Sequence, residues 1–197
     1  MASSIAQRIA SGSIDVAALA GDLDGMPPDV RLREVRGLGK AEQARLFDAA
    51  AGARPIGLSH LVPPGGSPLR EVIHAGRNSL PAFRIFEKRC CRPPRDTAEV
   101  WGYNEHAARW MTGPGYFVAA AGNPGEIVLD YTHVPAGKPE AWPAIRPNTG
   151  FPGRFVYGGG MHDVLRGVSE HVAVGRAFRR GKPMDNWFVL CRVDPAP

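Results

Sequence analysis

The chain has 197 residues, which is long enough for a folded domain with its own hydrophobic core. Its 44% hydrophobic and 22% charged residues are typical of a globular protein and argue against disorder. No apolar run approaches the roughly 20 residues that a membrane-spanning helix needs, and the net charge of +5 would allow an anionic partner. Because the N-terminus lacks the apolar core of a secretory signal, we expect a cytoplasmic protein.

The cysteines predict reduced thiols. Cys90 and Cys91 are neighbours, with Cα atoms about 3.8 Å apart, below the usual disulfide range of about 4.4 to 6.8 Å. Cys191 would then have no partner. No Cys-x-x-Cys motif and no flanking histidine marks a zinc site or a nucleophile, so we expect structural roles for the cysteines.

The first fifty-odd residues are predicted to be helical. The predicted helices cover residues 13–20, 27–35 and 39–52. Ser13 is a suitable N-cap for the first helix and Gly21 a stop signal. In the third, Ala44, Phe47 and Ala51 share one stripe. Helices this short must pack on a sheet or on a partner.

The next segment is rich in proline and glycine. Residues 54–68 carry the densest turn signal of the chain, and we place a subdomain boundary there. Beyond it, Phe83, Phe86 and Cys90 recur at helical spacing, which predicts a helix over residues 81–91.

From Val100 onward the pattern favours strands. Residues 113–132 predict a hairpin around the Gly-Asn-Pro-Gly turn at 122–125. Residues 135–152 contain five prolines and predict a long surface loop, of the kind that often forms a lid or a covering loop. Residues 161–168 fit either a short helix or a bent strand.

The last part of the chain predicts a hairpin that closes the core. Strand 171–178 is followed by a turn over 179–186 and a final strand over 187–193. In the final strand one face carries Trp187, Val189 and Cys191, and the other carries Phe188, Leu190 and Arg192. Because of the arginine we expect the second face to be partly solvated, with Val189 more deeply buried than Leu190.

These elements predict an α+β fold, with N-terminal helices followed by a curved, mainly antiparallel sheet or half-barrel that a C-terminal hairpin closes. The chain divides into a helical subdomain (1–55), a connection with a helix (56–96) and a barrel-like β domain (97–197).

The sequence lacks the common catalytic and cofactor motifs, including the nucleotide-binding glycine loops, the zinc-protease helix and the hydrolase nucleophile elbow. No cofactor is predicted. His162 and His171 lie nine residues apart, and the acids beside them point to the opposite strand face, so we predict no metal site.

Aromatic residues on β segments favour a binding protein for a small apolar or amphipathic ligand with an acidic head group. The aromatic candidates are Tyr103, Trp110, Tyr116, Phe117, Tyr131 and Trp187. Arg77 and Arg166 are the candidate partners of the head group, because arginine binds carboxylates through two hydrogen bonds. The predicted ligand-binding residues are Arg77, Asn78, Tyr103, Tyr116, Tyr131, Arg166 and His171.

Two other functions fit the sequence. A metal-independent isomerase or cyclase would need acid and base groups that converge in the cavity, drawn from Tyr103, His106, Asp130, His133, His162 and His171. A protein that binds nucleic acid or another polyanion would need the basic clusters at 84–95 and 176–182 to share one face. Few aromatic residues interrupt these clusters, which argues against a platform for single-stranded nucleic acid.

Overall fold

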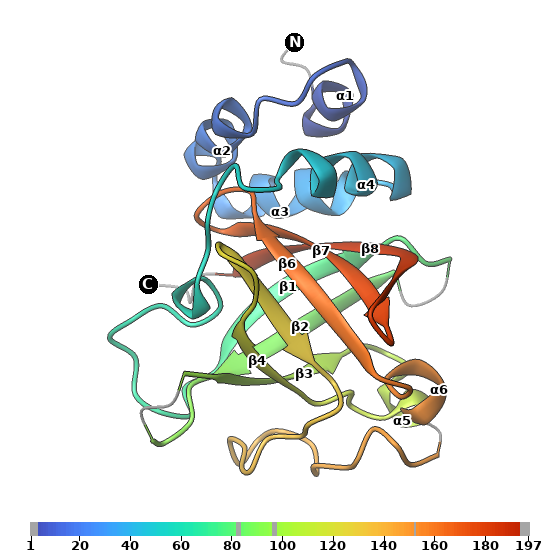
Figure 1. The fold of residues 1–197 in the computed structure, drawn as a ribbon. Coiled ribbons are helices and arrows are strands. Elements are labelled where there is room, and N and C mark those ends of the chain that lie inside the picture. Colours follow the sequence, from blue (N-terminus) through green and yellow to red (C-terminus); the bar gives the residue numbers. More distant parts are fainter. Residues whose placement is uncertain (1–3, 82–83, 96–97, 152, 194–197) are drawn as a thin grey trace.

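A computed structural model describes residues 4–81, 84–95, 98–151 and 153–193 of the chain. Within these ranges helices come first and a closed antiparallel barrel follows (Figure 1). The helices are α1 (Ile5–Ala10), α2 (Val16–Gly25), α3 (Pro28–Gly37), α4 (Lys40–Ala49), α5 (Arg109–Thr112) and α6 (Gly153–Val156), with a 3₁₀ turn at Leu58–His60. The strands are β1 (Val72–Asn78), β2 (Ile85–Cys91), β3 (Val100–Glu105), β4 (Phe117–Ala121), β5 (Glu126–Asp130), β6 (Met161–Gly167), β7 (Val172–Arg179) and β8 (Lys182–Val193).

The barrel closes through pairing between its first and last strands. Each strand pairs with the next, and β1 pairs with β8, where Ala75 lies opposite Cys191. A closed barrel has no free edge along which another chain could pair. The prediction of an α+β fold with a curved antiparallel sheet is therefore confirmed, and the sheet closes completely.

Two hydrophobic clusters hold the architecture together. Inside the barrel, alternate residues of the strands pack on one another, among them Phe117, Leu129 and Leu190. Outside, α3 and α4 pack against β7, β8 and β1, with Leu46 and Val189 in the shared cluster, and α1 packs on α3 and α4 (Figure 1). The helices thus bury the outer face of the closing strands.

The predicted N-terminal helices exist, but the details of two of them differ. Helix α2 is capped by Asp15, whose carboxylate accepts a hydrogen bond from the backbone N–H of Ala18, and Gly21 lies inside the helix. The Ser13 cap and the Gly21 stop were therefore wrong, because the carboxylate nearer the helix satisfies its first amides. In α4 the buried residues are Gln43, Leu46 and Phe47 rather than an Ala44–Phe47–Ala51 stripe.

Strand β2 corrects the helix predicted over residues 81–91. Phe86, Lys88 and Cys90 alternate into the barrel, and the strand pairs with β1 and β3 on its two sides. Pairing with both neighbouring strands outweighs the helical spacing of the apolar residues. The alternation of buried and exposed residues is hard to see in the sequence because Lys88 points inward. Phe83 lies outside the described residues. The segment 56–96 thus contains two barrel strands, while the three-part division of the chain stays a prediction.

Strand β6 resolves the ambiguity over residues 161–168. Met161, Asp163 and Leu165 are buried and alternate with half-buried residues, which is the pattern of a strand with one face inside the barrel. The hairpin between β4 and β5 is confirmed, and Gly125 takes the positive φ of 82° in its turn.

The C-terminal hairpin is confirmed, with a shorter turn than expected. Strand β8 begins at Lys182, directly after Arg180 and Gly181, and runs for 12 residues. The two faces alternate as predicted, but the face of Arg192 is not solvated. Val189 and Leu190 are both fully buried, because helices cover the outer face and the barrel interior covers the other.

Candidate functional site in the barrel cavity

A cavity of about 340 Å³ opens at the end of the barrel that α5 and α6 flank (Figure 1). Its walls are largely apolar and include Phe86, Phe188, Met161, Met184 and Tyr157. Ligand sites commonly have volumes of roughly 300 to 1,000 Å³, so this one suits a small molecule. The segment with Leu61 and Val62 packs into the interior cluster at the opposite end.

Four polar side chains meet in the wall of this cavity. The ammonium group of Lys88 donates hydrogen bonds to Asn104 Oδ1 at 2.9 Å, to the Tyr131 hydroxyl at 2.6 Å and to Asp163 Oδ2 at 3.1 Å. The Tyr131 hydroxyl in turn donates to Asp163 Oδ2 at 2.9 Å. All three ammonium protons therefore have acceptors within the protein. We refer to Lys88, Asn104, Tyr131 and Asp163 as the polar quartet.

Strand alternation explains how the quartet forms. Lys88 and Asn104 lie opposite each other on β2 and β3 and point inward. Asp163 lies on β6, and Tyr131 directly follows β5, where its backbone N–H donates to Met161. Inward positions of nonadjacent strands can meet only after the barrel has closed.

The barrel interior strongly perturbs the quartet. Burial lowers the pKa of Lys88, and the neighbouring carboxylate of Asp163 partly opposes that shift. Burial and the charge of Asp163 raise the pKa of Tyr131 well above its usual value. The rings of Phe188 and Phe117 have centroids 4.8 and 5.2 Å from the Lys88 nitrogen, which favours the ammonium form. Perturbed ionisable groups in a cavity are typical of functional sites.

A second polar group lies at the mouth of the cavity. The Tyr157 hydroxyl is 3.4 Å from His106 Nε2, and the Thr112 hydroxyl is 3.1 Å from the same nitrogen. Burial lowers the pKa of His106, although the charge of Glu105 partly opposes this shift.

Arg179 is a cation that also lines the mouth. One of its terminal nitrogens donates to the backbone carbonyls of Val156 at 3.3 Å and Phe155 at 3.5 Å. Its Nε is buried and has no hydrogen-bond partner among the described residues.

Of the predicted ligand-binding residues, the structure places Asn78 and Tyr131 in the cavity wall. Arg77 points outward and donates to the backbone carbonyl of Arg36 at 2.6 Å. Arg166 also points outward and pairs with Glu126 at 2.6 Å. The two arginines therefore hold helices and strands together on the outside of the barrel.

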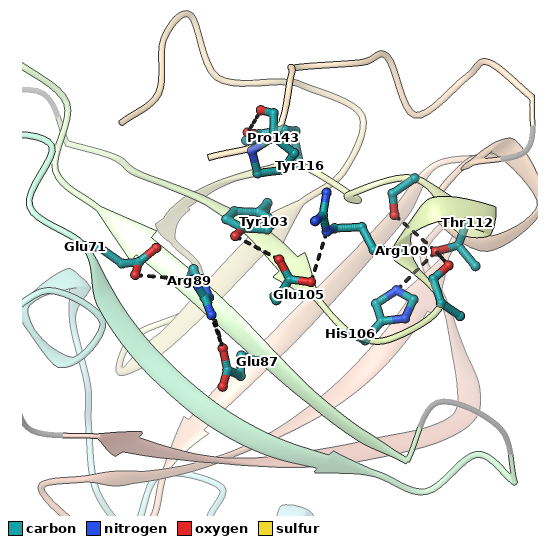
Figure 2. A network of polar contacts seen from close by, with 12 residues as sticks. Glu71, Glu87, Arg89, Tyr103, Glu105, His106, Arg109, Thr112, Tyr116 and Pro143 are labelled. Atoms are coloured by element: carbon teal, nitrogen blue, oxygen red, sulfur yellow. Dashed lines mark hydrogen bonds and ion pairs between the residues drawn. The ribbon is translucent and has the colours of Figure 1, made fainter. Parts of the chain in front are cut away.

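Tyr103 and Tyr116 lie on the outer surface of the barrel, beneath the loop of residues 135–152. Figure 2 shows Tyr103 donating to Glu105 and Tyr116 donating to the carbonyl of Pro143, at 3.2 and 2.6 Å. Both rings pack on the buried Trp142 of that loop. The part of the loop around Trp142 thus covers the side of the barrel, while its end at Phe151 contacts Phe155 of the cavity wall.

His171 lies in the β6–β7 turn at the opposite end, 3.0 Å from the guanidinium of Arg192. A ligand role for Arg77, Arg166, Tyr103, Tyr116 and His171 stays a prediction.

The six residues proposed for acid–base catalysis do not converge. Asp130 and His133 form an exposed pair at 2.7 Å, and His162 stacks on Phe178 on the outer face of the barrel. Tyr103 and His171 lie elsewhere, as described above. His106 is the one member of this set in the cavity wall, so any acid–base site here must use other partners.

The structure divides the basic cluster at 84–95 between the inside and the outside of the barrel. Lys88 points inside, Arg89 pairs outside with Glu71 and Glu87 (Figure 2), and Arg92 donates to the carbonyl of Pro63. Alternation and pairing along β2 therefore prevent the residues at 84–95 from forming one basic face.

The described ranges contain no group of three or more histidine, cysteine, aspartate or glutamate side chains arranged to hold a metal ion. Nor do they contain a helix that is long and apolar enough to cross a membrane.

The sequence analysis missed Lys88, Asn104, Asp163 and Arg179. A signal for Lys88 and Asp163 was present, since each stands between two apolar residues at alternate positions, Phe86 and Cys90 or Met161 and Leu165. A charge inside an otherwise apolar alternation indicates a buried polar site.

No protein-family model matches this chain, and no curated protein sequence matches it significantly.

Proposed function

We propose that the protein binds a small amphipathic ligand in the barrel cavity, with the apolar body of the ligand against the rings and methionines of the wall. The observation that carries this proposal is the polar quartet, whose buried ion pair between Lys88 and Asp163 lines a largely apolar cavity. Retaining a buried ion pair is costly, and a hydrophobic pair of similar volume often stabilises a fold as well. A ligand that recognises the pair would explain its presence.

The position of Arg179 is the reason why we expect an acidic head group at the mouth of the cavity. All three protons of Lys88 are already donated within the quartet, so the ammonium group has none left for a ligand carboxylate. The Nε of Arg179, in contrast, is buried beside the cavity without a partner among the described residues. A carboxylate could accept its hydrogen bond.

The carboxylate of Asp163 is the reason why we expect a hydrogen-bond donor at the inner end of the ligand. Both hydrogen bonds from Lys88 and Tyr131 reach Oδ2. Oδ1 receives none from the residues that the structure describes, so it is available to a ligand hydroxyl. Medium-chain hydroxy acids and small cyclic acids with a hydroxyl group fit both ends of the cavity.

The test measures thermal stability of the whole chain against paired ligands, namely medium-chain fatty acids, their ω-hydroxy derivatives and the corresponding alcohols. A ligand at about 100 times its Kd should stabilise the folded state by about 2.7 kcal/mol. We expect acids to bind more tightly than alcohols. Absence of stabilisation by every member of the panel would contradict the proposal.

Arg179→Gln should weaken acid binding about tenfold or more, since a hydrogen bond to a charged group contributes about 1.5 to 3 kcal/mol. It should leave alcohol binding nearly unchanged. Arg180→Gln is the matched control, because Arg180 is exposed in the adjacent turn and does not line the cavity. Equal losses in both variants would place the head group elsewhere.

A second candidate function is a metal-independent isomerase that uses the quartet for proton transfer. It is favoured by the hydrogen-bonded contact of an ammonium, a phenol and a carboxylate within one cavity. The test incubates a ligand found by the panel in D₂O and follows proton exchange by NMR. If the protein is an enzyme, the wild-type protein should accelerate exchange and Asp163→Asn should abolish that acceleration. Exchange at the buffer rate with wild-type protein would rule the enzyme out.

A further inference from the structure

Large apolar side chains are exposed around the mouth of the cavity. Trp110 on α5 is 84% exposed, and Phe151 and Phe155, before and within α6, are 82% and 63% exposed. We use the name mouth patch for Leu80, Ile85, Trp110, Met111, Phe151 and Phe155, all of which are exposed. Among the described residues, the exposed large apolar side chains outside this patch are Val134, in the loop after β5, and Val193, at the opposite end of the barrel. Such a concentration at one end marks an interaction surface.

The mouth patch surrounds one opening. Leu80 and Phe155 both line the cavity at its mouth. The rings of Phe151 and Phe155 meet edge to face, with centroids 6.2 Å apart. Helices α5 and α6 lie together at this end in Figure 1, and the contact between Tyr157 and His106 joins the segments that carry them.

Positive charge accompanies these apolar side chains. Arg84, Arg154 and Arg180 are exposed at this end, and the guanidinium of Arg154 lies 4.8 Å from the ring of Phe155. The acids nearby are already paired, Glu105 with Arg109 and Asp130 with His133. An apolar centre surrounded by arginines that form no ion pair with the described residues complements a membrane surface that contains anionic lipids, because aromatic rings enter the headgroup region and arginines bind the phosphates.

We propose that the mouth patch docks on the surface of an anionic membrane, with Trp110, Phe151 and Phe155 inserted among the headgroups. In this orientation the cavity opens toward the lipid. The inference rests on the patch and its charges and does not depend on ligand binding in the cavity.

The test is cosedimentation of the whole chain with phosphatidylcholine vesicles, with and without phosphatidylserine. We expect binding to the mixed vesicles that falls as salt rises and little binding to phosphatidylcholine alone. Trp101 and Trp142 are buried and Trp187 is half-buried, so a blue shift of tryptophan emission that depends on Trp110 would report insertion of that ring. Trp110→Phe should keep most of the binding and lose the shift.

Variants locate the docking face. Phe151→Ser and Phe155→Ser should each lower the partition coefficient about tenfold, as expected for loss of one inserted ring. Arg154→Glu should weaken binding further, whereas Arg33→Glu, on the distant helix α3, and Val193→Ser should not. Each variant must keep the wild-type melting temperature, which the exposure of these residues favours.

Three results would overturn the proposal. The first is absence of binding to both vesicle types, and the second is binding that the control variants weaken as much as the mouth-patch variants do. The third is a concentration-dependent dimer that Phe155→Ser dissociates, since a second copy would then cover the face. Thermal stabilisation by ligands in the absence of vesicles tests ligand binding in the cavity by itself. Failure of either proposal therefore leaves the other testable.

Discussion

The ammonium nitrogen of Lys88 lies 3.1 Å from Oδ2 of Asp163 inside the barrel, and neither side chain is more than 4% exposed. The two residues lie 75 positions apart on strands that are not neighbours. Because both charged groups are buried, removal of either side chain leaves the other charge in the barrel without its partner.

Removing one charge of this pair should destabilise the protein strongly. We expect Lys88→Met or Asp163→Leu to cost about 3 to 5 kcal/mol, because the remaining charge would be buried without its partner. The double variant should cost much less than the sum, and urea unfolding measures all three values. As a control, Arg33→Met at the exposed pair with Asp29 should cost no more than about 1 kcal/mol. Single variants as stable as the wild type would show that the pair is not formed.

Stability should fall on acidification because two histidines are buried in the neutral form. Burial, with smaller contributions from neighbouring positive groups, lowers the pKa of His60 to about 3 and that of His74 to about 4. In the unfolded chain both titrate near about pH 6.5, so the unfolded state takes up protons first as the pH falls. The loss should begin at about pH 6.5, continue to about pH 4 for His74 and to about pH 3 for His60, and amount to a few kcal/mol.

Variants isolate this effect from the titration of carboxylates. His60→Gln and His74→Gln cannot take up a proton in this range, so each should flatten the curve of unfolding free energy against pH. If unfolding free energy falls with the same slope between pH 6.5 and 4 in both variants and in the wild type, other groups cause the acid sensitivity.

Gly175 should tolerate no side chain. A Cβ atom at this position would lie 2.2 Å from Cζ of Phe188, inside the barrel. We expect Gly175→Ala to cost about 1 to 3 kcal/mol through overpacking. The matched control is Gly21→Ala in α2, where no atom lies within 4 Å of the added carbon, and a gain of about 0.5 to 1 kcal/mol is expected. Thermal unfolding measures the change in stability of both variants. Similar changes in Gly175→Ala and Gly21→Ala would contradict the predicted clash with Phe188.

The two central residues of β8 should both be essential to the core. Val189 packs beneath the helices and Leu190 inside the barrel, and both are fully buried. We expect Val189→Ala to cost about 1 to 3 kcal/mol and Leu190→Ala about 2 to 5 kcal/mol, since the larger side chain leaves the larger cavity. Denaturant unfolding measures both costs, and a folded Val189→Asp protein would show that the helices do not cover β8.

Several elements could be predicted because their signals are local. The hairpin at 122–125 follows from its turn residues, and the alternation of β7 and β8 follows from their β-branched and small residues. Strand β2 was missed because Lys88 interrupts the apolar alternation, and its pairing partners lie outside the segment. The candidate site was largely missed for the same reason, with Tyr131, Asn78 and, from the acid–base hypothesis, His106 as the exceptions.

The sequence by itself determined that helices precede an antiparallel sheet, the two hairpins and which residues share each face of the predicted strands, since these depend on neighbours a few positions apart. It did not determine which face points into the barrel. The face of Arg192 looked solvated and is buried, because a closed sheet with helices on its outside covers both faces of β8. Only the tertiary structure decided that Lys88, Asn104, Tyr131 and Asp163 meet, since closure of the barrel joins strands far apart in the chain, and burial there sets their charges and hydrogen bonds.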